Sequence, residues 1–215
     1  MVTQRDSLSS MLVDDAGIGK SMAAKWFVKN NKYAFRIDCS DHNNKSSLIR
    51  AIAQTVGVGS DGKLNDLLSD SIYALQQMEL PILIFDEAGD LEDKAYLILK
   101  RLYNALEGSC GFYLIGADGM KRKIKSGVAT GRLGFVEVFS RFRRNFKKVT
   151  PDLLDEKVTF YKQQAIDIAT ANGLNNEEAQ AIAKMLTRNG KLNDMRFVED
   201  AIKGFLKRKK NSNGN

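Results

Sequence analysis

Gly17, Gly19, Lys20 and Ser21 stand in a Gly-x-Gly-Lys-Ser segment, the main part of a P-loop, which follows a short apolar stretch and precedes a helical one. Glycines at this spacing let backbone N–H groups curl around phosphate oxygens at a helix N-terminus. The lysine of such a segment reaches the β- and γ-phosphates of a nucleotide, and the serine hydroxyl can bind magnesium. We therefore predict an ATP and Mg²⁺ site whose phosphate-binding residues are Ala16, Gly17, Ile18, Gly19, Lys20, Ser21 and Met22.

Asp14 departs from this motif, because the P-loop pattern has its first glycine at that position. A carboxylate close to a triphosphate repels it, and a side chain there strains a backbone that favours glycine. The sequence therefore predicts that Asp14 weakens nucleotide affinity.

Asp86 and Glu87 end the apolar run Ile-Leu-Ile-Phe, which has the length and composition of a buried parallel strand. An aspartate at the tip of such a strand can hold magnesium together with Ser21, and the adjacent glutamate can polarise an attacking water. The alternative is that both acids cap the helix that follows. Together with the Gly-Lys-Ser segment, the pair favours the catalytic interpretation.

The composition of the 215 residues excludes several other classes of site. His42 is the single histidine, which argues against a multi-histidine metal site and a Ser–His–Asp triad. Cys39 and Cys110 are too few for a disulfide framework, which fits a reducing cytoplasm. No apolar run approaches the roughly 18 residues that cross a bilayer, and the N-terminus lacks a signal-peptide profile. We expect a cytoplasmic protein without a membrane partner.

The net charge of +7 is concentrated in residues 119–148, which contain ten basic residues and one acid, Glu137. The rest of the chain has 23 basic and 25 acidic residues. A solvated basic face is one interpretation, and a phosphate-backbone contact is the other. For the second, the expected DNA-binding residues lie in a loop after the fourth strand and are Lys121, Arg122, Lys123 and Lys125.

Strand and helix patterns alternate through the first 150 residues, which predicts an α/β fold with a doubly wound, five-stranded parallel sheet. The expected strands are 8–13, 33–40, 82–85, 112–116 and 146–149. The expected helices are 22–30, 46–56, 64–78 and 94–106.

After Pro151 the pattern is helical, with helices expected over 154–171, 176–188 and 194–209. Asn175 and Asn193 suit N-caps, and Gly173 and Gly190 suit helix ends. We predict an α/β core over 1–150, a small helical lid over 151–210 and a disordered tail over 211–215.

These motifs together resemble the AAA+ ATPases, and the resemblance covers nearly the whole chain. It implies that the Gly-Lys-Ser segment is Walker A and that Asp86 and Glu87 are Walker B. It further implies that Arg141, in a Ser-Arg-Phe tripeptide, is an arginine finger offered to a neighbouring subunit, with Arg143 and Arg144 as rivals. Asp118 matches the nucleotide-sensing position after the fourth strand, and Arg196 the lid arginine that reaches ATP in cis.

Within AAA+ proteins, the chain resembles the MuB-like target-selecting ATPases of transposition. That resemblance implies a ring or helical filament of this chain on double-stranded DNA, with a transposase as a further partner. IstB- and DnaC-like helicase loaders, or clamp loaders, are the alternative. A non-hydrolysing nucleotide-binding scaffold is the third interpretation, which Asp14 favours.

Overall fold

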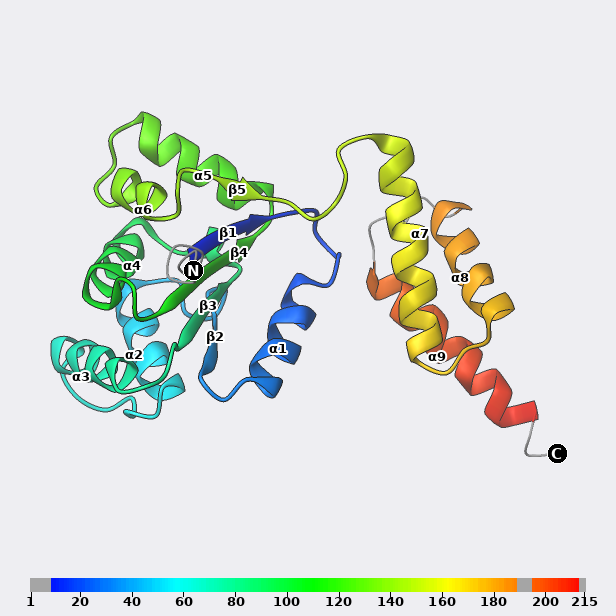
Figure 1. Cartoon of the computed structure of the whole chain (residues 1–215), viewed down its shortest axis with the longest axis horizontal. Coiled ribbons are helices and arrows are strands. Elements are labelled where there is room, and N and C mark those ends of the chain that lie inside the picture. The colour runs from blue at the N-terminus through cyan, green and yellow to red at the C-terminus, as the bar shows by residue number, and fades with distance from the viewer. Residues whose placement is uncertain (1–8, 189–194, 213–215) are drawn as a thin grey trace, which may run out of the picture. The chain divides into compact units, whose positions relative to one another are not determined.

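A computed structural model describes residues 9–188 and 195–212 (Figure 1). Within these residues, five strands form one parallel sheet in the order β2-β3-β4-β1-β5. The strands are β1 (Ser9–Val13), β2 (Ala34–Asp38), β3 (Ile82–Asp86), β4 (Gly111–Gly116) and β5 (Phe146–Lys147). Each overlaps the range expected from the sequence, so the α/β fold with a five-stranded parallel sheet is confirmed.

The sheet is doubly wound, because the chain runs from the inner strand β1 to β2 at one edge and then returns through β3 and β4. Figure 1 shows α1 on one face of the sheet and α2, α3 and α4 on the other. Their bounds are α1 (Lys20–Asn30), α2 (Lys45–Thr55), α3 (Leu64–Gln76) and α4 (Asp93–Leu106). In sheets of this kind, ligands bind beyond the carboxyl ends of the strands.

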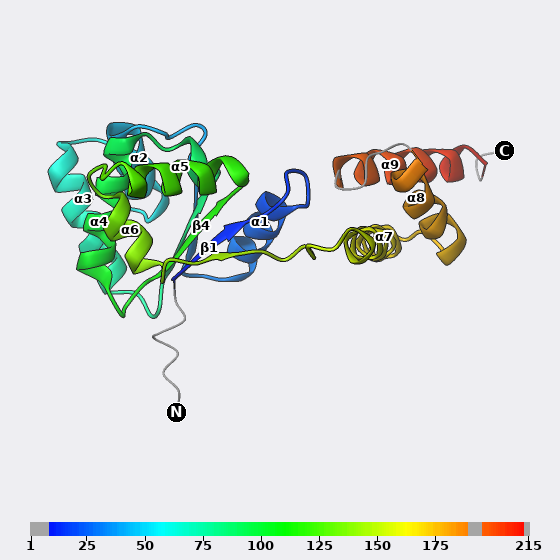
Figure 2. The same ribbon diagram turned by 90° about the horizontal axis from the view of Figure 1, so that it is seen from above.

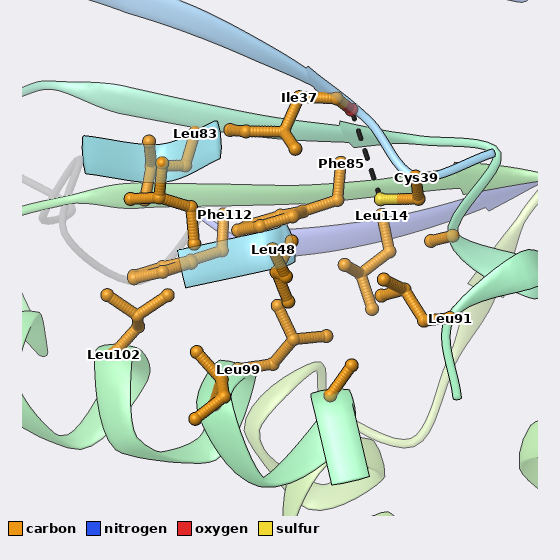
Figure 3. Close-up of a cluster of buried hydrophobic side chains, with 14 of the residues drawn as sticks. Ile37, Cys39, Leu48, Leu83, Phe85, Leu91, Leu99, Leu102, Phe112 and Leu114 are labelled. Carbon is orange, nitrogen blue, oxygen red and sulfur yellow. Dashed lines mark hydrogen bonds between the residues drawn. The ribbon is translucent and has the colours of Figure 1, made fainter. Parts of the chain in front are cut away.

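The strand β3 is apolar throughout because both of its faces are covered. Leu83 and Phe85 are fully buried in the larger core beneath α2 and α4, where they lie near Leu48, Leu99 and other labelled side chains (Figure 3). Ile84 points to the opposite face and packs with Ala24 of α1. Burial of the Phe85 side chain contributes roughly 1.5–3 kcal/mol relative to exposure. This packing places Asp86 at the end of a rigid strand.

Two helices follow β4 where the sequence predicted a basic loop: α5 (Asp118–Ala129) and α6 (Phe135–Arg141). The prediction of a loop was wrong. Met120, Ile124 and Gly127 form the buried face of α5 at helical spacing, and Gly127 gives Phe135 room, since a Cβ atom there would lie 2.4 Å from the phenylalanine ring. Arg122 and Lys125 lie on the exposed part of the same helix.

A second compact unit contains residues 148–212 and, from the other end of the chain, the P-loop residues Asp14–Gly19. Its helices are α7 (Leu154–Ala171), α8 (Asn176–Arg188) and α9 (Met195–Ser212). In Figure 2, α7 is seen end-on beside α8 and α9. Their own core includes Tyr161, Ala165, Ile182 and Val198, together with Ile18 of the P-loop.

The ends of these helices match several expectations. Asn175 caps α8, since its Oδ1 accepts from Glu178 N at 2.9 Å, and Gly173 has a φ of +86° just after α7. Helix α9 runs to Ser212, so residues 211 and 212 are helical rather than part of a tail. Asn193 and Gly190, which were expected as a helix N-cap and a helix end, lie outside the described residues. In residues 9–188 and 195–212, no helix is long and apolar enough to span a membrane.

Candidate nucleotide-binding site

Ser21, in the first turn of α1, contacts the carboxylate at the end of β3. Its Oγ donates a hydrogen bond of 3.1 Å to Asp86 Oδ1. The fold thus brings together a hydroxyl and a carboxylate that are 65 residues apart in the sequence. Oxygen ligands of this kind suit Mg²⁺, which is usually held by one or two protein oxygens, waters and phosphates. These two residues therefore fit the predicted metal.

Asp86 is fully buried, and Arg36 of β2 neutralises it. Arg36 Nε donates to Asp86 Oδ2 at 2.8 Å, and the same guanidinium contacts Asp38 Oδ2 at 2.7 Å. Burial alone would raise the pKa of Asp38, but hydrogen bonds from Ser40 and Arg36 outweigh it and hold that pKa below the usual value. We call Ser21, Arg36, Asp38 and Asp86 the strand-end cluster. Neither Arg36 nor Asp38 was among the site residues predicted from the sequence.

Glu87 follows Asp86 directly, in the left-handed conformation with a φ of +52°, and precedes the short helix η2 (Ala88–Asp90). Its side chain is exposed, as access by a water molecule requires. Partial desolvation and the charge of Asp86 raise the pKa of Glu87, and the charge of Lys20 partly offsets this. A carboxylate with a raised pKa is a better proton acceptor near neutral pH.

Asp14 lies buried against the segment that leads into α7. Its carboxylate accepts hydrogen bonds from Val149 N at 2.7 Å, Thr150 N at 3.0 Å and Thr150 Oγ1, and from Asp15 N at 2.8 Å. Burial acts to raise the pKa of Asp14, but these hydrogen bonds dominate and lower it. The P-loop pattern predicted Asp14 only as a charge close to the phosphates and did not indicate these contacts.

Asp15 contacts α7 itself. It accepts a hydrogen bond of 2.9 Å from the Tyr161 hydroxyl and forms an ion pair with Lys157. Burial and the adjacent carboxylate raise the pKa of Tyr161, so its hydroxyl stays a donor. We call Asp14, Asp15, Thr150, Lys157 and Tyr161 the loop clasp.

Within the second unit, the backbone of Gly17 and Ile18 contacts α7 and α9. Gly17 and Gly19 have φ values of +82° and +91°, which favour glycine. Gly17 O accepts from Met195 N at 2.9 Å, and Ile18 O accepts from Gln164 Nε2 at 3.1 Å. The start of α9 thus lies at the P-loop, and Arg196 is the next residue of that helix.

Other predicted site residues have different surroundings. Arg141 ends α6, and its Nε and Nη2 donate to Asn104 Oδ1 of the same chain at 3.0 and 2.9 Å. Its rivals Arg143 and Arg144 are exposed, with φ values of +60° and +53°. The remaining residues expected to touch the nucleotide, Ala16, Met22 and Asp118, are exposed.

The four residues expected to bind DNA lie on α5. Arg122 and Lys125 are exposed and Lys121 is partly exposed. Lys123 differs, because its Nζ donates to Gly89 O at 3.1 Å and to Leu91 O. Lys123 therefore holds the chain after Glu87.

Comparison with known proteins gives the same fold. Cdc6p from Pyrobaculum aerophilum is similar with a TM-score of 0.52 and 16% identity, and the match covers 74% of this chain and 41% of Cdc6p. The Aeropyrum pernix ORC1 protein in complex with DNA has a TM-score of 0.51 and 13% identity, with 92% of this chain and 59% of ORC1 covered. The Aeropyrum pernix ORC2 protein with ADPNP and ADP has a TM-score of 0.54 and 16% identity, with 92% of this chain and 62% of ORC2 covered. The chain thus spans less than two thirds of the length of each.

A comparison with curated proteins gives no match. Residues 4–124 match the family described as the AAA domain. This match covers more than half of the sequence and contains the P-loop, β3 and Glu87. The protein belongs to the AAA domain family.

Proposed function

We propose that the protein binds and hydrolyses ATP with Mg²⁺, and the hydrogen bond between Ser21 and Asp86 is the observation that carries this proposal. Lys20 contacts the β- and γ-phosphates, and Ser21 and Asp86 hold the metal. A Mg²⁺ ion held by these two residues would neutralise charge that develops on the phosphate oxygens. The residues from Ala16 to Met22 surround the phosphates, and Asp118 senses the γ-phosphate.

Glu87 is the proposed base for the attacking water. Its exposed carboxylate and the raised pKa support this role. The proposed role of Arg196 is to reach the nucleotide in cis, which is supported by the hydrogen bond from Met195 N, the preceding residue of α9, to Gly17 O of the P-loop. An arginine there stabilises charge on the γ-phosphate because its cationic fork is fixed in shape.

Calorimetric titration of ATP with Mg²⁺ into the parent protein and Lys20→Ala tests the binding step. We expect the variant to show no measurable binding, because it lacks the cation on the β/γ-phosphates. Lys25→Ala, an exposed lysine of the same helix, is the matched control and should bind as the parent does. Equal affinity of Lys20→Ala and the parent would refute the site.

We further propose that the chain assembles and that Arg141 acts on the nucleotide of a neighbouring subunit. Its bond to Asn104 means that assembly must redirect this side chain. Arg141→Ala should bind ATP as the parent does but lack assembly-stimulated hydrolysis. Mixing it with Glu87→Gln subunits should restore some activity, since some interfaces then join an intact Arg141 to an intact Glu87. No recovery at any ratio contradicts a role in trans.

The proposed partner of the assembly is double-stranded DNA, which the exposed cations of α5 support; the similar ORC1 structure is also a DNA complex. Replacing Lys121, Arg122 and Lys125 with alanine should weaken binding to every duplex. It should also flatten the dependence of log affinity on log salt, by about one unit for each phosphate that the variant no longer neutralises.

A matched variant replaces Lys207, Arg208 and Lys209 of α9 with alanine and should keep the salt dependence. If this variant loses the salt dependence and the α5 variant keeps it, the DNA contact lies on α9 and not on α5.

The biological role that we propose is target selection and transposase activation. A replication role, as a helicase or clamp loader, is the second candidate, because the similar solved structures are Cdc6 and ORC proteins. DNA-bound protein that stimulates strand transfer by a transposase supports the first role, and DNA-bound protein that loads a replicative helicase supports the second. A non-hydrolysing nucleotide-binding scaffold is the third candidate, and a parent protein that binds ATP without hydrolysing it would support this role.

A further inference from the structure

Arg36 joins two acids at the carboxyl ends of neighbouring strands. In the register of the sheet, Asp38 of β2 lies opposite Asp86 of β3. Arg36 precedes Asp38 by two residues and therefore lies on the same face of β2. Its Nε and Nη2 reach Asp86 Oδ2 at 2.8 and 2.7 Å, and Nη2 also reaches Asp38 Oδ2 at 2.7 Å.

The two oxygens of Asp86 thus have different partners. Oδ2 accepts from Arg36, whereas Oδ1 accepts from Ser21 Oγ and from Glu87 N at 3.2 Å. A fully buried carboxylate without a cation is costly, so Asp86 needs Arg36 as a counter-charge. A planar guanidinium also fixes direction, which a point charge does not.

The guanidinium of Arg36 also contacts a second carboxylate, that of Asp38. Asp38 accepts from its guanidinium and also, through Oδ1, from Ser40 Oγ at 2.6 Å. The Arg36 side chain is only 16% exposed, so it has little freedom to turn away. Ser40, Asp38 and Arg36 therefore form a chain of contacts that ends at Asp86 Oδ2.

We propose that Arg36 is a positioning residue, which acts through Asp86 by engaging Oδ2 and directing Oδ1 toward Ser21 and the magnesium position. The inference rests on the proposed function and adds a residue that no P-loop motif contains. Partners that orient a metal ligand typically change metal affinity by about 10- to 100-fold when they are replaced.

The test compares ADP binding by calorimetry in EDTA and in MgCl₂ for the parent, Arg36→Lys and Asp38→Asn. Arg36→Lys keeps a positive charge beside Asp86 and should fold. In EDTA we expect it to bind ADP as the parent does. In MgCl₂ we expect the increase in ADP affinity that Mg²⁺ causes to be about tenfold or more smaller than in the parent. Asp38→Asn should reduce this increase in affinity by a smaller factor. Arg50→Lys, whose arginine holds the carbonyls of Ser60 and Gly62, is the matched control and should keep it.

The same substitution in an Asp86→Asn background separates positioning from a direct contact. If Arg36 acts through Asp86, Arg36→Lys has no further effect there. The inference is overturned if Arg36→Lys lowers the Mg²⁺-dependent ADP affinity equally in the parent and in Asp86→Asn. It is also overturned if Mg²⁺ increases the ADP affinity of Arg36→Lys as much as that of the parent. A parent protein whose ADP affinity does not depend on Mg²⁺ overturns the proposed metal site together with it.

Discussion

Asp86 in the strand-end cluster and Asp14 in the loop clasp are both buried carboxylates, 0% and 3% exposed, and the protein stabilises them in different ways. Asp86 is paired with the guanidinium of Arg36. Asp14 accepts hydrogen bonds from the backbone and hydroxyl of Thr150 and from the backbone of Val149. The first arrangement uses a cation and the second uses neutral donors.

The kind of donor, and not the number of contacts, separates the two carboxylates. A carboxylate offers about four lone-pair positions, and both acids have two contacts on each oxygen. Asp14 Oδ1 accepts from Asp15 N and Thr150 Oγ1, and its Oδ2 accepts from Val149 N and Thr150 N. Asp86 Oδ2 contacts two nitrogens of Arg36, and its Oδ1 accepts from Glu87 N and from the Ser21 hydroxyl, which can turn toward a metal. One carboxylate is therefore suited to tie segments together, and the other to hold a ligand.

Glu87→Gln is expected to have the largest effect, because it changes the chemistry beside the strand-end cluster without changing its packing. Loss of a base lowers the rate constant of hydrolysis by about 10²–10⁴-fold. ATP affinity and thermal stability should match the parent, since the side chain is exposed. Single-turnover hydrolysis, calorimetry and thermal unfolding measure the three quantities.

Glu92→Gln is the matched control, as Glu92 is exposed and makes no side-chain cap to α4. Hydrolysis by Glu87→Gln at the parent rate would show that Glu87 is not the base.

Asp14→Ala should have the next largest effect, on stability rather than on hydrolysis. It leaves Val149 N and the buried Thr150 without their acceptor, which costs about 1–3 kcal/mol in the free energy of unfolding. Chemical denaturation measures this change. Asp14→Gly, which restores the P-loop glycine, should lose as much stability. If Asp14→Gly instead binds ATP more tightly and keeps its stability, repulsion of the phosphates is the main role of Asp14.

The sequence was sufficient for features that depend on neighbouring residues. The continuous apolar run of β3 predicted a strand covered on both faces, and Leu83 and Ile84 indeed pack into separate cores. The helix α5 could have been predicted from Met120, Ile124 and Gly127, but the intervening lysines and arginines obscured that spacing.

Contacts between distant segments could not be predicted in the same way. The partners of Asp14 lie 135 and 136 residues away, and nothing in the P-loop motif indicates them. Arg36 and Asp38 alternate on β2 as many strand residues do. Their role depends on the register that sets Asp38 opposite Asp86, which follows from packing of the whole sheet.

The loop clasp should make stability depend on pH in the acid range. The pKa values of Asp14 and Asp15 are lowered in the folded protein from an ordinary 3.8, so the stabilisation is present above that value. It is lost as the pH falls through 3.8 and through the lower folded pKa values. The difference in unfolding free energy between the parent and Asp14→Ala should therefore narrow between pH 7 and pH 3. A constant difference in urea denaturation at the two pH values contradicts this explanation.

Tyr161→Phe should have the smallest effect, because it removes one hydrogen bond to Asp15 and leaves the ring in the core of α7, α8 and α9. Lys157 still neutralises Asp15, so the expected loss is about 1 kcal/mol in the free energy of unfolding. Tyr73→Phe, at a tyrosine that is 66% exposed, is the matched control and should leave stability unchanged. Combining Tyr161→Phe with Asp14→Ala measures the coupling of the two acids, since residues in one network do not act additively. A loss in Tyr161→Phe that exceeds the loss in Asp14→Ala would show that the clasp depends mainly on Asp15 and not on the fully bonded carboxylate of Asp14.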